Sequence, residues 1–235
     1  DWIYRKGETD FSKMSNLSKE LRARLDQRFE ASLPEVSGKQ KSSNGDTIKL
    51  RLKLRDGKEI ESVLMRERGK TTICISSQVG CAQGCLFCAT GTMGIVRNLK
   101  ASEMVGQILV FKKILGNSFP KSFRLVFMGM GEPFHNLNQL FRALDILTDS
   151  KGVGIGSRKI TVSTSGVIKG IYRLMEHKPQ IQLAISLHTA DQELRQKWIP
   201  NHRESVRDIL EAARVFTEKT GRKITIEMVL FGGDY

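Results

Sequence analysis

The residues of this 235-residue chain best suited to chemistry are its four cysteines, which all lie between positions 74 and 88. Three of them form the loop Cys81-Ala-Gln-Gly-Cys85-Leu-Phe-Cys88, directly after an apolar stretch. Thiolates at this spacing can converge on one soft metal centre, and a [4Fe–4S] cluster held by three cysteines leaves one iron open to a substrate. Two alternatives remain: a structural zinc site with Cys74 as fourth ligand, and buried cysteines that bind nothing.

A glycine-rich segment with a single carboxylate is the second candidate, Met128-Gly-Met-Gly131-Glu132-Pro133. Glycines let the backbone approach a ligand closely, and Glu132 offers an acceptor for an ammonium group or a ribose hydroxyl. An ordinary glycine turn at a strand end is the alternative interpretation. The segment lacks the third glycine of a dinucleotide-binding fingerprint, and the sequence contains no Walker A loop.

Two further segments, Ser163-Thr164-Ser165-Gly166 and Ser186-Leu187-His188, add hydroxyls and an imidazole. Each is ordinary alone, because hydroxyls cap helices and a lone histidine is usually structural. However, each stands at the end of a predicted strand, and the cysteine loop and Glu132 follow two other predicted strands. Because the carboxyl ends of parallel strands open onto one rim, we expect thiols, carboxylate, hydroxyls and imidazole to share one site.

The elements that must position these groups alternate between strand and helix. Apolar, β-branched runs predict strands at 71–76, 124–128, 159–163, 181–186 and 223–231. Apolar residues at helical spacing predict helices that include 104–115, 137–147, 168–176 and 206–216, the last ending near Gly221. This alternation predicts an α/β fold with a parallel sheet and right-handed crossovers.

The first 70 residues follow a different pattern. Residues 1–30 read as short helices, with Asn16 as an N-cap and a buried stripe at i+4 spacing formed by Leu17, Leu21, Leu25 and Phe29. Residues 31–46 contain proline, glycines and serines and read as a linker. We therefore divide the chain into a helical segment with its linker (1–45), a basic β-hairpin (46–70) and an α/β part (71–235).

The predicted hairpin places a carboxylate among apolar side chains. Apolar and basic residues alternate from Thr47, and Asp56-Gly57 predicts a two-residue turn. With that turn Leu52 faces Glu61, so Glu61 lies on the apolar face of the hairpin. A shift of one residue in the pairing of the two strands would move Glu61 to the solvent-exposed face.

The net charge of the chain indicates what kind of partner it binds. Lysine and arginine exceed aspartate and glutamate by 13, which favours a polyanionic partner such as nucleic acid. Residues 39–58 carry seven basic residues against two acidic ones, which indicates either phosphate contact or a solvated strand face. No apolar run is long enough to span a membrane. Clustered cysteines without a disulfide pattern indicate a reducing compartment, and we expect the cytoplasm, or an organelle if the source is eukaryotic.

These segments, in this order, resemble the radical S-adenosylmethionine (SAM) superfamily and, more closely, the RlmN/Cfr-type RNA methyltransferases, which modify an adenine carbon. The resemblance implies a partial (βα) barrel with parallel strands, preceded by a small helical and β-hairpin accessory region. It rests on Trp2-Ile3-Tyr4, Thr9-Asp10-Phe11, Met14–Ser18, Cys74–Cys81, Arg97-Asn98-Leu99, Met128–Pro133, Thr161–Gly166 and Ala184–His188.

The resemblance also implies roles for the candidate residues. Cys81, Cys85 and Cys88 would ligate a [4Fe–4S] cluster, whose open iron would bind SAM. The residues that match the SAM contacts of the family are Gly131, Glu132, Ser163, Ser186, Leu187 and His188. Glu61 matches the residue that takes a proton from the adenine, and an apolar face would raise the pKa of its carboxyl to suit that role. Cys74 matches one of two non-cluster cysteines that form and resolve a protein–RNA adduct.

The implied activity is methylation of adenine C2 in 23S ribosomal RNA, with transfer RNA as a further candidate substrate and flavodoxin or ferredoxin as electron donor. Three alternatives stay open: a non-catalytic RNA-binding or assembly protein, a C8-methylating relative, and a radical SAM enzyme with another substrate. The chain starts at Asp1 and stops after an apolar run, so we expect missing segments at both ends. The methyl-carrying cysteine of the family lies in a downstream segment, so we expect this chain as written not to complete methyl transfer.

Overall fold

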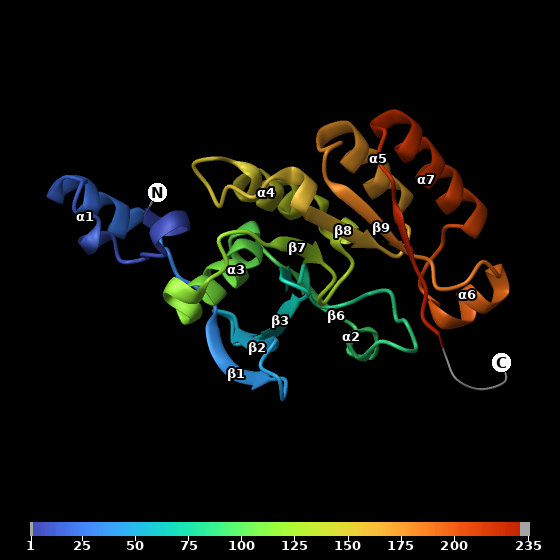
Figure 1. Ribbon diagram of the computed structural model, residues 1–235, viewed down its shortest axis with the longest axis horizontal. Helices are drawn as coiled ribbons and strands as arrows, with labels where there is room; N and C mark the ends of the chain where they lie inside the picture. Colours follow the sequence, from blue (N-terminus) through green and yellow to red (C-terminus); the bar gives the residue numbers. More distant parts are fainter. Residues whose placement is uncertain (1, 231–235) are drawn as a thin grey trace.

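A computed structural model describes residues 2–230 of the chain (Figure 1). Within them one eight-stranded sheet has the order β1-β2-β3-β4-β7-β8-β9-β10. The pairs from β1 to β4 are antiparallel and those from β4 to β10 are parallel, which confirms the expected α/β class. The strands are β1 (Glu35–Lys41), β2 (Thr47–Lys53), β3 (Glu59–Glu67), β4 (Lys70–Cys74), β7 (Arg124–Phe127), β8 (Ile160–Thr164), β9 (Gln182–Ser186) and β10 (Thr225–Glu227).

Helices connect the parallel strands and cover the sheet. Their apolar residues recur every three or four positions, so each helix buries one stripe, which includes Phe111, Leu144, Leu174 and Phe216. Figure 1 shows α3, α4, α5 and α7 following one another along the outside of the sheet. The helices are α1 (Lys19–Arg28), α2 (Ala89–Thr92), α3 (Ala101–Leu115), α4 (Leu137–Thr148), α5 (Ile168–His177), α6 (Gln192–Trp198) and α7 (Val206–Thr220). No helix in residues 2–230 is long and apolar enough to cross a membrane.

A two-stranded ribbon closes the cysteine loop at its base. Its strands are β5 (Gln78–Gly80) and β6 (Ile95–Asn98), and they pair in antiparallel fashion. Gly80 has a φ of +74°, and a Cβ there would lie 1.9 Å from the Gly94 carbonyl oxygen. Only glycine therefore fits, and the adjacent Cys81 N–H donates to that same oxygen at 2.9 Å. The ribbon holds the two ends of the loop together.

The hairpin register differs by one residue from the predicted one. Leu54 and Lys58 pair across a three-residue loop, and Gly57 has a positive φ while Asp56 does not. A two-residue type I′ turn needs a positive φ at both positions, whereas a three-residue loop needs it at one. Glu61 consequently faces Arg51, and its carboxylate is 47% exposed and 2.9 Å from the Lys49 ammonium group. The prediction that Glu61 lies on the apolar face is therefore wrong.

The N-terminal region also departs from the prediction. Helix α1 starts at Lys19 with Ser18, not Asn16, as its N-cap, and it buries none of its residues. Phe29, which was to end the buried stripe, is 63% exposed; Phe11 and Met14 are buried instead. The predicted linker contains β1, an edge strand whose backbone pairs with β2. The sequence analysis missed this strand because an edge strand that is exposed to solvent on both faces shows no alternation of apolar and polar residues.

The parallel strands begin and end within a few residues of their predicted positions. The largest difference is at β10, which is predicted over 223–231 and observed over Thr225–Glu227. Phe231 lies outside the described residues. Helix α6 was not predicted, because its seven mainly polar residues carry little apolar periodicity; the Asp191 carboxylate caps it by accepting from the Leu194 N–H.

Candidate functional site

A cavity of about 310 Å³ opens at the carboxyl ends of the parallel strands. It brings together most of the residues that the sequence singled out, from four separate segments of the chain. The predicted site residues in its lining are Cys81, Cys85, Cys88, Gly131, Glu132, Ser163, Ser186 and His188. Leu187 is buried beside the cavity, and Glu61 and Cys74 lie outside its lining.

The three loop cysteines contribute partly buried free thiols to one side of the cavity. Burial raises the pKa of Cys81, and burial together with the neighbouring Cys81 and Cys88 raises the pKa of Cys85 to about 12. A thiol binds a metal ion only after it has lost its proton. A soft cation can therefore take the place of the protons on these thiols. Among residues 2–230 no three Cys, His, Asp or Glu side chains are grouped as ligands of a single ion. A cubane takes one thiolate per iron, so three cysteines can hold a [4Fe–4S] cluster and leave one iron without a protein ligand, whereas a structural zinc site has four protein ligands.

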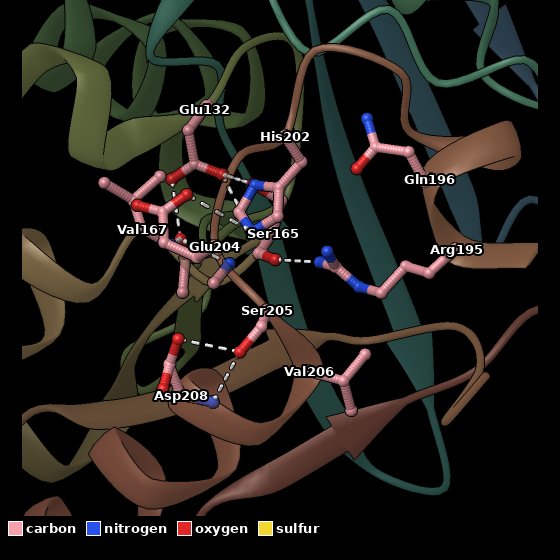
Figure 2. Close-up of polar contacts among 12 residues, drawn as sticks. Glu132, Ser165, Val167, Arg195, Gln196, His202, Glu204, Ser205, Val206 and Asp208 are labelled. Carbon is pink, nitrogen blue, oxygen red and sulfur yellow. Dashed lines mark hydrogen bonds and ion pairs between the residues drawn. The ribbon is translucent and has the colours of Figure 1, made fainter. Parts of the chain in front are cut away.

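Glu132 also lines the cavity and is only 3% exposed. One carboxylate oxygen accepts from the Thr164 hydroxyl at 2.9 Å and the Phe134 N–H at 3.0 Å. The other accepts from the N–H and the hydroxyl of Ser165, at 2.8 and 2.9 Å. Four donors from two strand ends therefore hold this carboxylate in place, as Figure 2 shows for Ser165.

The glycine before Glu132 is required by the packing beneath it. Gly131 has a φ of +101°, and a Cβ there would lie 2.5 Å from Cβ of Gln78. The Gln78 side chain accepts from the Glu132 N–H at 2.9 Å and donates to Asn98 at 2.7 Å. The ribbon below the cysteine loop is thus joined to the glycine-rich segment, so these two segments of the cavity are positioned together.

A second carboxylate, Glu227 on β10, was missed by the sequence analysis. It accepts from the hydroxyls of Ser163 and Ser186, both at 2.9 Å, and these hydroxyls lie 3.2 Å apart. The sequence did contain a signal for this residue. Glu227 lies inside a predicted apolar strand, two residues after Thr225, and a glutamate there must face either solvent or a polar site. Three adjacent strands therefore present one polar surface to the cavity.

His188 adopts a rare backbone conformation at the end of β9. Its φ is +68°, a strained value for a residue with a side chain, and its N–H donates to the Glu227 carbonyl at 3.0 Å. Its ring meets that of Phe87 edge-on, with centroids 4.6 Å apart. Burial lowers the pKa of His188, and its buried Nδ1 has no partner within the described residues. A neutral imidazole next to the cavity is therefore available to a ligand.

Glu61 and Cys74 share a face of the sheet with the polar surface of the cavity. Side chains alternate along a strand, so Glu61 and Val63 lie on one face, and Val63 pairs with Cys74. Cys74 in turn pairs with Val126 on β7. Burial raises the pKa of the Cys74 thiol to about 11. Cys74 thus lies on the strand next to β7, whose end lines the cavity, and Glu61 lies one strand further away on the same face of the sheet.

Two further buried residues behind the cavity were not found from the sequence. Arg195 on α6 is 2% exposed and donates to the carbonyls of Leu187, at 3.1 Å, and Ser165. It thereby joins the ends of β8 and β9, and Figure 2 shows its contact with Ser165. His202, in the loop after α6, lies with Nδ1 3.5 Å from the Ser165 hydroxyl. Neither residue stands in a recognisable motif, so only the tertiary structure identifies them.

The chain is similar to known proteins along its whole length. Residues 75–235 match the family model described as the radical SAM superfamily, and residues 1–31 match that of the ribosomal RNA large subunit methyltransferase N-terminal domain. Proteins described as probable dual-specificity RNA methyltransferase RlmN are 43% identical over 99% of the chain in Bacillus velezensis and 45% identical over 100% in Bacillus thuringiensis. The chain spans 64% and 65% of the length of these two relatives.

A solved structure shows the same fold. The crystal structure of a radical SAM methyltransferase from Sphaerobacter thermophilus superposes with a TM-score of 0.93 and 41% identity, over 99% of this chain and 68% of that one. The matched family model covers the cysteine loop, the glycine-rich segment and every parallel strand after β4. From its sequence, its fold and the residues gathered around its cavity, the chain belongs to the radical SAM superfamily.

Proposed function

We propose that the chain is the SAM- and cluster-binding part of an RlmN-type RNA methyltransferase that modifies C2 of an adenine in 23S ribosomal RNA, with transfer RNA as a second substrate. The observation that carries the proposal is the cavity itself. Three thiols, two carboxylates, three serine hydroxyls and an imidazole line it together. The matched RlmN proteins, described as RNA methyltransferases, support the substrate class.

The residues present fit both cofactors. Cys81, Cys85 and Cys88 would hold a [4Fe–4S] cluster, because three soft donors from one loop leave one iron open. In the same cavity, Glu132 and Glu227 would attract the ammonium group of SAM, and the face of one ring of the edge-on pair Phe87 and His188 could stack on its adenine. When bound, the cluster and SAM supply the one-electron chemistry that makes an inert carbon reactive.

The protein itself contributes positioning, proton transfer and shelter from water. The half-exposed Glu61 carboxylate would remove the proton from the substrate base, and its pairing with Lys49 keeps it oriented until the base arrives. Cys74 would act in resolving the protein–RNA adduct. Its raised pKa keeps the thiol protonated and unreactive until the reaction requires it.

The surface charge supports polyanionic and acidic partners. A net charge of +13 favours RNA, and it also favours an acidic electron donor of the flavodoxin or ferredoxin kind. On strands β1 and β2 the exposed basic residues include Lys39, Lys41, Arg51 and Lys53. These residues would contact the phosphate backbone, since they lie on the accessory strands rather than in the cavity.

Anaerobic reconstitution with iron and sulfide tests the proposal. The chain should become brown, bind close to four irons per molecule, and cleave SAM when it is reduced. Cys85→Ala should abolish colour and cleavage and leave salt-dependent RNA binding intact, whereas the matched variant Cys74→Ala should keep the cluster. RNA binding without a cluster in the wild-type chain would instead identify a non-catalytic RNA-binding protein.

The reaction product tests the position of methylation. A chain extended to the length of its relatives, incubated with ribosomal RNA and labelled SAM, should yield 2-methyladenosine. A product methylated at C8 would assign the protein to the other branch of the family.

A further inference from the structure

The carboxylate of Glu132 has no free acceptor site in the structure. A carboxylate offers about four lone-pair positions, and four protein donors already occupy them. A ligand ammonium group can therefore bind Glu132 strongly only if one of these donors turns away. The question is which donor can do so without leaving a buried group unpaired.

Three of the four donors are fixed. The N–H groups of Phe134 and Ser165 belong to the backbone, and the guanidinium of Arg195 holds the Ser165 carbonyl. The Thr164 hydroxyl oxygen accepts from the N–H groups of Gly166 and Val167, at 3.1 and 3.2 Å, so its hydrogen remains directed at Glu132. Only the Ser165 hydroxyl is free to rotate.

The Ser165 hydroxyl has a second neighbour, His202. Nδ1 of His202 lies 3.5 Å from the Ser165 oxygen, against 2.9 Å from that oxygen to Glu132 (Figure 2). The imidazole is 3% exposed, and on its far side Nε2 lies 3.5 Å from the carboxylate of Glu204, whose side chain is 30% exposed. A line of polar groups thus runs from the cavity through Ser165 and His202 to the surface.

The surroundings of His202 define its protonation state. Burial lowers its pKa to about 4, as do the positive charge of Arg195 on α6 and His135 in the turn Pro133–Asn136, while Glu204 acts in the opposite direction. The ring is therefore neutral near pH 7. Nε2 makes no hydrogen bond within the described residues, and attraction to the Glu204 carboxylate 3.5 Å away favours the tautomer with its hydrogen on Nε2. Nδ1 then presents a lone pair to Ser165.

We propose that His202 and Glu204 are positioning residues for ligand binding, because they provide a second acceptor to which the Ser165 hydroxyl turns when an ammonium group reaches Glu132. The hydroxyl exchanges one hydrogen bond for another, so no buried donor is left unpaired. Glu204 acts through His202 by selecting the tautomer with a free Nδ1. This inference rests on the proposed function, since the ammonium group is that of SAM.

The test measures SAM affinity by equilibrium dialysis on the cluster-loaded chain. His202→Phe removes the acceptor, and we expect SAM to bind about 3- to 10-fold more weakly, as for the loss of one hydrogen bond. His202→Asn keeps an acceptor near the position of Nδ1 and should restore most of the affinity. His177→Asn, on the exposed end of α5, is the matched control and should bind as the wild type does.

A second readout needs neither cluster nor SAM. Long-range ¹⁵N NMR of the metal-free chain should show hydrogen on Nε2 of His202, and Glu204→Leu should increase the share of the other tautomer. Hydrogen on Nδ1 in the wild type would overturn the inference, as would wild-type SAM affinity in His202→Phe. A wild-type chain that loads its cluster and does not bind SAM would overturn the proposed function, even if the tautomer is the expected one.

Discussion

At the scale of single residues, the site consists of polar groups whose partners come from other strands. Glu132 is held by the end of β8, and Glu227 by the hydroxyls of β8 and β9. The buried carboxylate of Glu132 and the partly buried one of Glu227 need such donors to replace the water they have lost. Each carboxylate is therefore pre-positioned, and the cavity needs little rearrangement of its backbone to bind a charged ligand.

Cys74 provides a prediction at this scale. In a chain with Cys81, Cys85 and Cys88 replaced by alanine, the remaining thiol should react with iodoacetamide about 100-fold more slowly at pH 8 than an ordinary cysteine. The reason is a pKa raised from 9.0 to about 11, which lowers the thiolate fraction by the same factor. Mass spectrometry should show the rate rising about tenfold per pH unit up to pH 10. A plateau near pH 9 would contradict the prediction, and denatured chain is the control.

At the scale of elements, close approach of α5 positions the turn that follows Glu132. A Cβ on Gly170 of α5 would lie 2.1 Å from the ring of Phe134, which belongs to the turn Pro133–Asn136. The helix can pack this closely only because the glycine has no side chain. The same packing keeps the Phe134 N–H directed at the carboxylate of Glu132.

Gly170→Ala should therefore destabilise the fold by about 1–3 kcal/mol, because the ring of Phe134 has to move. It should also weaken SAM binding, since the turn carries a donor to Glu132. Urea unfolding and equilibrium dialysis measure the two effects. Gly156→Ala is the matched control, with φ of −60° and open space around its Cβ, and its effect should be within about 0.5 kcal/mol.

A salt-bridge network joins the accessory hairpin to the barrel. Arg97 on β6 donates to Asp56 in the hairpin loop at 2.7 Å and to both carboxylate oxygens of Glu103 on α3 at 2.8 Å. The hydrogen bond from Arg97 lowers the pKa of Asp56 to about 2. The interaction therefore couples the hairpin that carries Glu61 to the ribbon that closes the cysteine loop.

The pKa of Asp56 sets the expected pH dependence of this link. A carboxyl with a depressed pKa stabilises the fold fully above its ordinary value of 3.8 and loses that effect as the pH falls toward 2. Asp56→Asn should cost about 0.5–1 kcal/mol at pH 7, a modest amount because the pair is partly exposed. Thermal unfolding between pH 7 and pH 3 should show the difference from wild type shrinking below about pH 4. A constant difference would contradict the assignment, and Asp26→Asn on α1 serves as a control.

At the scale of the whole molecule, the positive charge is separated from the cavity. Exposed lysines occupy the accessory strands, while the cavity contains carboxylates, hydroxyls and thiols. This arrangement suits a polyanion that is bound across the accessory strands while a small part of it reaches the site.

The triple variant Lys39→Glu, Lys41→Glu and Lys53→Glu should therefore weaken RNA binding and reduce the slope of log K against log salt by about 2–3, since roughly one counterion is released per phosphate contact. Fluorescence anisotropy at several salt concentrations measures the slope. The control reverses three exposed lysines on the helical side, Lys151, Lys169 and Lys219, and has the same net charge. Equal losses in both variants would show that only total charge matters.

The residues of the cavity could largely be predicted before the fold was known, and particular residues show why. Cys85, Glu132, Ser163 and His188 each follow a predicted strand, and parallel strands end on one edge of a sheet, so their proximity follows from topology. Arg195 and His202 could not be predicted in this way. They reach the site from behind, through α6 and the loop after it, and nothing in their local sequence differs from that of a surface helix.

What the sequence alone determined is the alternation of strands and helices, the cysteine loop and the polar residues at the strand ends, because each depends on spacing within about ten residues. The tertiary structure decided the hairpin register, the edge strand β1 and the network behind Ser165. These depend on which distant backbone and side-chain groups become partners: one turn residue with positive φ moved Glu61 from the buried to the exposed face. Local patterns carry information about burial, whereas pairing between distant groups is settled only when the chain has packed.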